Sequence, residues 1–490
     1  MSIPTKDPDA GATPSPGGQR HTVTIEKLTF GGSGLARIDG MSVFVPDTIP
    51  GQQVEIELTK KKDTFAEARV VKVIRKAKDE IPARCSHFHD CGGCIWQNLP
   101  YDKQIAYKEQ IIAETLAHLT PVDEAARAQL AGRVLKTIPS PQIYHYRNKL
   151  EFSFGYQSMR TEEKGGRRLY FDEGPSVGFH QPGQWSTILP ISECHLYDEQ
   201  VGVLLADVRR FMEQTRLPVF NPKTQKGMLR NLLLRRGVHT GEQMICFLVH
   251  ARKKELEPLF QHFLRAFGGR PHLASLLVVE HLGLHEKPEF PKVHCLIGKP
   301  TITERLFDLT FEISPFSFFQ TNTLAAEKLY RAIADAAGLT SRDTVLDAYC
   351  GMGTIGQYLA RFCQKVVGVE SHPSAIDDAL KSAGRNRIAN ISFYKGRAEQ
   401  VLLDQIKPGG KYKFDVVILD PPRAGLHPKA RDAVLAHQPE KIVYVSCNTA
   451  TFARDLGEFI KGGYDLRTVQ PVDLFPHTAH IETVALLQRK

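Results

Sequence analysis

The sequence predicts an α/β protein with three structured parts, and the order in which strand and helix patterns follow one another predicts it. Along residues 321–490 strands alternate with helices, which is typical of a parallel sheet covered by helices on both faces. Residues 21–78 carry short strands separated by glycines and a Pro-Gly pair, the pattern of a small β-barrel. Residues 79–320 are strand-rich but mixed, so we expect a central α+β domain there. Residues 1–20 are rich in proline, glycine and small polar residues and predict a disordered tail.

Length and composition are those of an ordinary globular protein. The 490 residues suffice for about three domains. The chain carries 63 Lys and Arg against 54 Asp and Glu, a net charge of +9. This modest excess fits a polyanionic partner, and it equally fits a surface that serves only solubility. There is no apolar run long enough for a membrane span and no apolar N-terminal signal, so we expect a cytoplasmic protein.

Two regions of the sequence leave open whether they bind nucleic acid. Residues 60–62 are three consecutive lysines, which form either a solvated face or a phosphate-contacting surface. In the central part, arginines are interleaved with aromatic residues that either stack on unpaired bases or fill the core. These aromatic residues are Tyr144, Tyr146, Phe152 and Phe154.

The C-terminal part is divided into individual elements by its hydrophobic periodicity and its turn residues. We expect helices over residues 323–337, 354–363, 373–387, 427–437 and 450–461. We expect strands over residues 344–348, 365–369, 391–394, 415–419, 441–446, 466–472 and 481–488. Before this part, residues 101–119 predict a helix with an apolar stripe that includes Ile105, Ile111 and Ile112.

A glycine-rich turn follows the first strand of the C-terminal part. It begins at Asp347 and contains Gly351, Gly353 and Gly356, and Glu370 follows the next strand. Glycines let a backbone approach a ligand closely, and an acid at this place accepts hydrogen bonds from ribose hydroxyls. The spacing is not the strict G-x-G-x-x-G of dinucleotide sites, so it favours S-adenosylmethionine (SAM) over NAD.

Three further motifs stand at strand ends that face the same ligand crevice. Asp420-Pro-Pro-Arg423 lacks the aromatic residue of amine methyltransferases and the cysteine of RNA cytosine-5 methyltransferases. Cys447 is either a nucleophile at the crevice or an ordinary buried cysteine at a strand end. Glu482 is either a functional acid on a buried strand, where an acid is costly, or a surface residue at a strand edge.

The nine cysteines include a cluster that suggests a metal site. An odd number of cysteines in a cytoplasmic chain argues against a disulfide framework. Cys85, Cys91 and Cys94 lie within ten residues, and Cys194 is the best candidate for a fourth ligand. Zinc and a [4Fe–4S] cluster both fit these ligands. Four protein ligands leave no iron open, so a cluster here would be structural rather than reactive.

Taken together, these motifs resemble the bacterial RNA uracil-5-methyltransferases that make 5-methyluridine, in the 23S rRNA branch with a TRAM domain and an iron–sulfur cluster. The resemblance covers residues 21–488. Its motifs are Gly32-Ser-Gly34, the four clustered cysteines, Tyr146-Arg-Asn-Lys149, Phe318-Phe-Gln-Thr-Asn322, Asp420-Pro-Pro-Arg423, Ser446-Cys-Asn448 and His480-Ile-Glu482.

The resemblance implies a Rossmann-like class I SAM methyltransferase domain, a [4Fe–4S] cluster rather than zinc, and methyl transfer to carbon 5 of a uridine in 23S rRNA. It implies that Cys447 is the nucleophile that attacks C6 and that Glu482 is the general base. The implied SAM contacts are Gln320, Tyr349, Thr354, Glu370 and Asp420.

The alternatives are a tRNA uracil-5-methyltransferase and a catalytically silent iron–sulfur RNA-binding protein. A NAD-linked oxidoreductase is disfavoured by the glycine spacing and by the two prolines after Asp420. We expect a monomer that binds RNA but neither DNA nor a membrane.

Overall fold

The computed structural model describes residues 19–119, 130–156, 163–164, 167–168, 174–181, 184–283, 292–406 and 411–490. Residues 1–18 of the predicted disordered tail lie outside these ranges. The chain divides into two compact units, of which the smaller holds residues up to Pro82, Asn98–Pro100 and Thr161–Leu169, and the larger holds the rest. The domain limits expected from the sequence remain predictions. Within the described ranges, we find no helix with the length and apolarity needed to cross a membrane.

The smaller unit contains a six-stranded, strongly curled sheet. Its strands are β1 (Arg20–Thr24), β2 (Lys27–Leu28), β3 (Gly34–Ile38), β4 (Met41–Val45), β5 (Gln53–Lys61) and β6 (Phe65–Arg75), in the order β1-β5-β6-β4-β3-β2. Alternate residues such as Val43 and Val45, or Val54 and Ile56, point into one core. This alternation is the period of a strand with one buried face, and it agrees with the small barrel predicted from the sequence.

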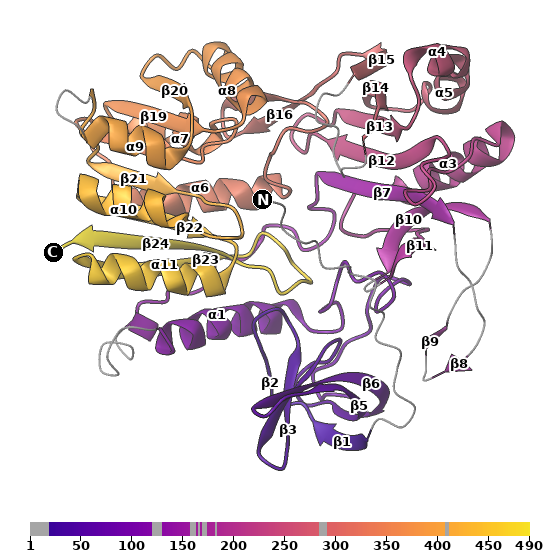
Figure 1. Cartoon of the computed structure of the whole chain (residues 1–490), viewed down its shortest axis with the longest axis horizontal. Helices are drawn as coiled ribbons and strands as arrows, with labels where there is room; N and C mark the ends of the chain where they lie inside the picture. Colours follow the sequence, from indigo (N-terminus) through magenta and orange to yellow (C-terminus); the bar gives the residue numbers. More distant parts are fainter. Residues whose placement is uncertain are drawn as a thin grey trace. The chain divides into compact units, whose positions relative to one another are not determined.

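The middle of the chain forms a seven-stranded sheet that is antiparallel except for one parallel pair, β13 with β14 (Figure 1). Its strands are β7 (Lys149–Tyr156), β10 (Pro175–Gln181), β11 (Gln184–Pro190), β12 (Leu229–Arg236), β13 (Gln243–Val249), β14 (Leu273–Glu280) and β15 (Lys292–Gly298). Helices α3 (Val201–Thr215) and α5 (Phe260–Phe267), with the short α4 (Lys253–Leu256) and η1 (Glu257–Leu259), accompany it. Leu232 and Leu234 pack in the core of α3 and α5, whereas Leu233 joins the core that reaches into the C-terminal part. The sheet is therefore buried on both faces.

The C-terminal sheet has the order β20-β19-β18-β21-β22-β24-β23. Its strands are β18 (Thr344–Ala348), β19 (Lys365–Glu370), β20 (Ile391–Lys395), β21 (Val416–Leu419), β22 (Lys441–Ser446), β23 (Tyr464–Val472) and β24 (Glu482–Arg489). The first five run parallel, and β24 runs antiparallel to its neighbours β22 and β23. A reversal of strand order lies between β18 and β21, where sheets of this kind bind their ligands.

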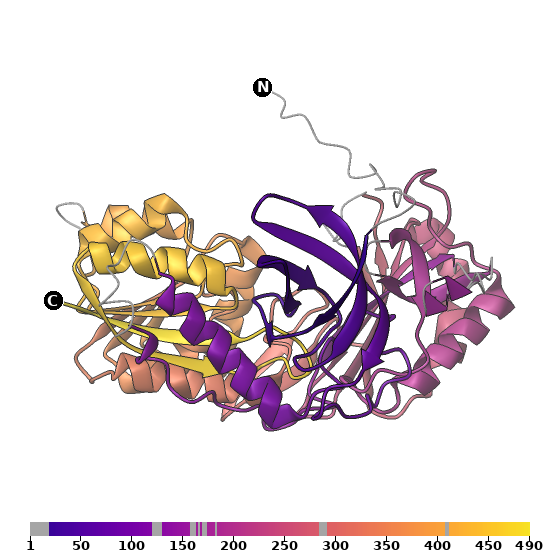
Figure 2. The same cartoon turned by 90° about the horizontal axis from the view of Figure 1, so that it is seen from below.

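Helices cover both faces of this sheet, as Figures 1 and 2 show. One face packs with α6 (Thr323–Ala337), α7 (Thr354–Leu359) and η2 (Ala360–Phe362), and α8 (Pro373–Arg385) lies beside β20. The other face packs with α1 (Tyr101–Ala117), α9 (Ala398–Ile406), α10 (Pro428–His437) and α11 (Thr449–Lys461). A hairpin of β16 (Ile302–Leu306) and β17 (Leu309–Ile313) precedes α6. The doubly covered parallel sheet predicted for the C-terminal part is thus confirmed.

Candidate active site and cysteine cavity

The predicted site residues of the C-terminal part gather at one edge of the sheet because of its topology. Strands β18, β19, β21 and β22 are parallel, so their carboxyl ends lie at the same edge. Strand β24 is antiparallel to β22, with Thr483 opposite Ser446, so its first residue, Glu482, lies at that edge as well. Glu370 ends β19, Asp420 follows β21 and Cys447 follows β22.

The backbone conformation of the turn after β18 depends on its glycines. Tyr349, Gly351 and Gly353 all have left-handed backbones, with φ of 64°, 55° and 74°. The Gly351 N–H donates to Glu370 Oε2 at 3.2 Å, which ties the turn to the next strand. A Cβ atom on Gly353 would lie 2.7 Å from the Phe393 ring, so no larger residue fits there without movement.

Carboxylates crowd this edge of the sheet and repel one another. Burial raises the pKa of Asp347 to about 7, and the neighbouring charges of Asp420 and Glu370 add to the shift. Burial likewise raises the pKa of Asp420 to about 7. Asp347 Oδ2 accepts a hydrogen bond from the Gly356 N–H at 2.8 Å, which leaves its charge only partly compensated. A bound cation, such as the sulfonium group of SAM, would relieve this repulsion.

The remaining predicted SAM contacts lie on α7, on the loop before α6 and in the turn after β18. Thr354 begins α7, and its Oγ1 is 2.7 Å from the hydroxyl oxygen of Tyr330 on α6. Gln320 lies two residues before Asn322, the N-cap of α6, and its main-chain carbonyl accepts from Asn148 Nδ2 at 2.8 Å. Burial, followed by nearby Glu399 and Asp455, raises the pKa of Tyr349 to about 12.

Cys447 occupies the single position between a strand and a helix cap. Strand β22 ends at Ser446, and the Asn448 side chain caps α11 by accepting from the N–H groups of Ala450 and Thr451. The thiol is half-buried. Burial and the nearby carboxyl group of Glu482 raise its pKa, whereas the Arg423 guanidinium lowers it through charge and a hydrogen bond.

Glu482 is buried, so the surface interpretation of this residue is wrong. Only 6% of it is exposed. Burial, reinforced by the charge of Asp420, raises the pKa of Glu482 well above its usual value, and Arg423 opposes this shift. A carboxyl group in such surroundings holds its proton until a cation approaches.

Two residues of the site were not assigned from the sequence. The sequence leaves two roles open for Arg423, stabilising an O4 enolate or binding a phosphate. In the structure its charge is close enough to lower the pKa of both Cys447 and Glu482. Its own carbonyl accepts from Asn448 Nδ2 at 3.2 Å, so the two loops are joined. Asp455 is buried on α11, where its Oδ2 accepts from the Tyr444 hydroxyl at 2.7 Å and from the Leu426 N–H at 2.8 Å. An acid on an otherwise apolar helix face was the only signal for Asp455.

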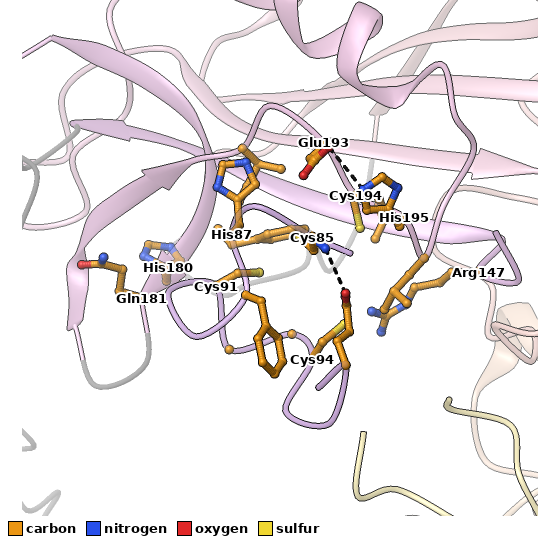
Figure 3. A pocket seen from close by; sticks show the side chains of 18 residues that line it. Cys85, His87, Cys91, Cys94, Arg147, His180, Gln181, Glu193, Cys194 and His195 are labelled. Carbon is orange, nitrogen blue, oxygen red and sulfur yellow. Dashed lines mark hydrogen bonds and ion pairs between the residues drawn. The ribbon is translucent and has the colours of Figure 1, made fainter. Parts of the chain in front are cut away.

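The four clustered cysteines line one cavity in the central part of the chain (Figure 3). The cavity has a volume of about 420 Å³ and is also lined by Arg147, Phe179 and His195. The segment that carries Cys85 is joined to the Cys194 loop, because Glu193 Oε1 accepts from the Ser86 N–H at 2.7 Å. The fold therefore brings Cys194 to the three cysteines of the first loop, although it lies 100 residues after Cys94 in the sequence.

The four thiols line the cavity, and burial raises the pKa of each of them. Burial raises the pKa of Cys91 to about 11 and of Cys94 to about 12, and charges on the other cysteines add to both shifts. Among the described residues, no group of three His, Cys, Asp or Glu side chains is placed to hold a metal ion. A zinc ion would need sulfur atoms about 2.3 Å from it on all sides, and the described side chains form no such group.

The central aromatic residues that were considered for base stacking belong mostly to the core. Tyr146, Phe152 and Phe154 are at most 5% exposed, so they cannot stack on RNA bases. Arg235 is buried too, and it donates to the carbonyl groups of Pro315 and Ser317. Phe318, in contrast, is 70% exposed two residues from Gln320.

Comparison with known proteins agrees with this architecture. Residues 301–490 match the family described as tRNA (Uracil-5-)-methyltransferase, and residues 15–71 match the TRAM domain. An uncharacterized RNA methyltransferase of Bacteroides thetaiotaomicron is 36% identical, over 93% of this chain and 99% of the relative. One of Porphyromonas gingivalis is 37% identical, over 95% and 99%.

A solved structure resembles the chain over almost its whole length. Pyrococcus abyssi tRNA (uracil-54, C5)-methyltransferase, in complex with S-adenosyl-L-homocysteine, superposes with a TM-score of 0.71 at 27% identity. The match covers 95% of this chain and 100% of that one. The fold class and the resemblance to RNA uracil-5-methyltransferases with a TRAM domain are thereby confirmed. The chain belongs to the SAM-dependent RNA uracil-5-methyltransferases that carry a TRAM domain.

Proposed function

We propose that this enzyme methylates carbon 5 of a uridine in 23S rRNA through a covalent bond between Cys447 and C6 of the base. The observation that carries the proposal is the meeting of Cys447, Glu482 and Arg423 beside Asp420 at the ligand edge of the sheet. The SAM molecule is assigned to Gln320, Tyr349, Thr354, Glu370 and Asp420.

In the first half of the reaction, Cys447 supplies the electrons that uracil C5 lacks. Its thiolate bonds to C6, and the C5–C6 π electrons move onto the O4 enolate. The nearby Arg423 guanidinium lowers the pKa of the thiol and so favours the thiolate form. The enolate then collapses so that C5 takes the methyl group, and the electrons of the broken carbon–sulfur bond stay on the sulfur of S-adenosylhomocysteine.

In the second half, Glu482 restores the aromatic base. Its carboxylate takes the proton from C5, the C–H electrons form the C5–C6 double bond, and the Cys447 thiolate leaves from C6. Burial beside Asp420 raises the pKa of Glu482, which makes its carboxylate a stronger acceptor for this proton.

The uridine must leave its stack to reach Cys447, either by flipping or from a single-stranded loop. The exposed ring of Phe318 is available to stack on an unpaired base. The TRAM unit, which includes the lysines at 60–62, would hold flanking phosphates.

A 5-fluorouridine-containing 23S rRNA fragment with SAM tests the mechanism. Because fluorine cannot leave as a proton, we expect a protein–RNA adduct that survives denaturation. Cys447→Ala should abolish the adduct, whereas the exposed Cys295→Ala should leave it unchanged. Glu482→Gln should trap an adduct on ordinary RNA. Wild-type protein that forms no adduct, or an adduct that persists in Cys447→Ala, would refute the proposal.

We also propose that Cys85, Cys91, Cys94 and Cys194 hold a [4Fe–4S] cluster. Support comes from the four thiols lining one cavity of about 420 Å³ and from the family resemblance. Bound through four thiolates, the cluster would have a structural role. Cysteines that form no disulfide fit a reducing compartment such as the cytoplasm. Anaerobically purified protein should contain about four iron and four sulfide per chain, and protein that contains zinc instead would overturn the assignment.

A tRNA substrate is the second candidate. The tRNA enzyme from Pyrococcus abyssi matches 95% of this chain, so the presence of the N-terminal parts does not exclude tRNA. Fluorinated 23S rRNA and tRNA transcripts, compared in one experiment, separate the two. We expect the adduct on the rRNA, and an adduct on tRNA alone would replace the rRNA proposal without affecting the chemistry.

A further inference from the structure

The loop that leads into Glu482 is buried along much of its length. It joins β23 to β24 over residues 473–481. Asp473 and Leu474 are fully buried, and His477 is 3% exposed with a left-handed backbone at φ 66°. Loops ordinarily run over the surface, because their polar groups need partners. A buried loop directly before the proposed base therefore needs an explanation.

Helix α1 supplies one set of partners, from Lys108 on its buried face and from Tyr101, its first residue. Lys108 Nζ donates to Asp473 Oδ1 at 2.7 Å and to the Phe475 carbonyl at 3.0 Å. Neither side chain of the Lys108–Asp473 pair is exposed at all. The Tyr101 hydroxyl donates to the other oxygen of Asp473 at 2.9 Å. The start of the loop is thus held by α1 on both carboxylate oxygens.

Gln104, one turn before Lys108, holds the middle of the loop. Its Oε1 accepts from the His477 N–H at 2.8 Å, and its Nε2 lies 3.1 Å from His477 Nδ1. The same Nε2 donates to the Trp96 carbonyl at 3.0 Å. One amide group therefore joins the loop before Glu482 to the segment that follows Cys94.

The segment after Cys94 also contacts the loop directly. The Ile95 and Trp96 N–H groups both donate to the His477 carbonyl, at 2.9 and 3.1 Å. The Tyr144 ring stacks on His477 with centroids 4.3 Å apart. Cys94 is thus one peptide bond away from a hydrogen bond to the loop, and the loop reaches Glu482 five residues after His477.

We propose that Gln104 and Lys108 are positioning residues for Glu482, and that the Cys94–Trp96 segment makes this positioning depend on ligation of Cys94. The inference rests on the proposed roles of Glu482 and the cysteine site. A general base must lie within hydrogen-bond reach of the proton that it takes. If Cys94 lost its ligand, the Ile95 and Trp96 N–H groups would be held less firmly. The loop would then lose the fixed hydrogen-bond donors that support the His477 carbonyl.

Replacement of Gln104 tests the positioning. Gln104→Met keeps the volume and removes the hydrogen bonds, and Gln104→Glu keeps only the acceptor for His477. Gln110→Met is the matched control, because Gln110 is an exposed residue of the same helix. Single-turnover mixing with ordinary RNA measures formation of the methylated adduct and its breakdown separately, and calorimetry measures SAM affinity.

For Gln104→Met we expect adduct breakdown to slow by about ten- to a hundredfold, the cost of misplacing a catalytic group by about 1 Å. Methyl transfer and SAM affinity should stay within about twofold, and Gln104→Glu should be intermediate. Normal breakdown in Gln104→Met while Glu482→Gln traps the adduct would refute the positioning role alone. Equal slowing of both steps would refute it too, because that indicates a general structural role. Failure of Glu482→Gln to trap any adduct would instead refute the proposed base.

Hydrogen exchange tests the dependence on Cys94 without any turnover. In Cys94→Ser, and in wild-type protein treated with an iron chelator, we expect the Ile95 and Trp96 amides and the loop amides to exchange about fivefold faster or more. Amides of β18 serve as the internal control. Unchanged exchange in residues 475–482 after loss of the metal would refute the link between the cysteine site and the base loop.

Discussion

Alanine substitution in the turn after β18 should separate backbone strain from steric crowding. Gly351 and Gly353 both have left-handed backbones, which cost an ordinary residue about 1–2 kcal/mol. An added Cβ meets nothing within 4 Å at Gly351, but it lies 2.7 Å from the Phe393 ring at Gly353. Overpacking of this kind costs about 1–3 kcal/mol more. Gly353→Ala should therefore destabilise the loop by about 2–5 kcal/mol, and Gly351→Ala by about 1–2 kcal/mol.

The assay is SAM binding by calorimetry, together with the thermal unfolding midpoint. SAM affinity should fall at least about tenfold in Gly353→Ala and less in Gly351→Ala. Gly384→Ala is the control, because Gly384 lies in α8 without a left-handed backbone and its Cβ meets nothing within 4 Å. It should bind SAM normally and be stabilised by up to about 1 kcal/mol. Wild-type SAM affinity in Gly353→Ala, or equal effects in Gly351→Ala and Gly353→Ala, would refute the reasoning.

Four further predictions follow from charges in the site and beneath it. Arg423→Gln removes the cation that lowers the pKa of Cys447, so alkylation of this thiol by iodoacetamide should require higher pH; an unchanged pH profile would exclude Arg423 as its partner. Asp347 and Asp420 have pKa values of about 7, so SAM should bind more tightly as pH rises from 6 to 8 and both ionise, by up to about tenfold per pH unit for each proton released. S-adenosylhomocysteine, which lacks the sulfonium charge, should show a much smaller pH dependence, and equal dependence for both ligands would contradict the electrostatic explanation. Because these acids have raised pKa values, their burial should also make the SAM-free protein less stable as pH rises from 4 to 8, as measured by urea unfolding. Lys108→Met leaves a fully buried carboxylate without its cation and should destabilise the protein by about 3–5 kcal/mol, whereas loss of an exposed lysine costs under about 1 kcal/mol, so a small loss in urea unfolding would count against a charged pair.

The bounds of strongly periodic helices and strands could be predicted from the sequence, whereas those of short helices could not. The expected helix 323–337 and the strands 344–348 and 441–446 coincide with α6, β18 and β22. The expected helix 354–363 instead divides into α7 and a 3₁₀ turn, and α9 was missed altogether. Short helices owe their stability to tertiary packing rather than to propensity, so a local pattern carries little information about them.

The predicted helix 101–119 was placed correctly, but part of its buried face was predicted wrongly. Ile111 and Ile112 are buried as expected, but Ile105 is only half-buried. The buried face includes Gln104 and Lys108 in its place. Hydrophobic periodicity cannot identify buried polar residues, because their partners, at residues 473–477, are more than 360 residues away in the sequence.

The sequence by itself determined the order of strands and helices in the C-terminal part, the types of residue at the strand ends and the four cysteines. Those features depend on local periodicity and on chemistry that each side chain carries alone. Only the tertiary structure decided that Arg423 lies near both Cys447 and Glu482, that four thiols line one cavity, and that helix α1 holds the loop before Glu482. Charge interactions and hydrogen bonds depend on distance in space, and the fold, rather than spacing along the chain, sets that distance.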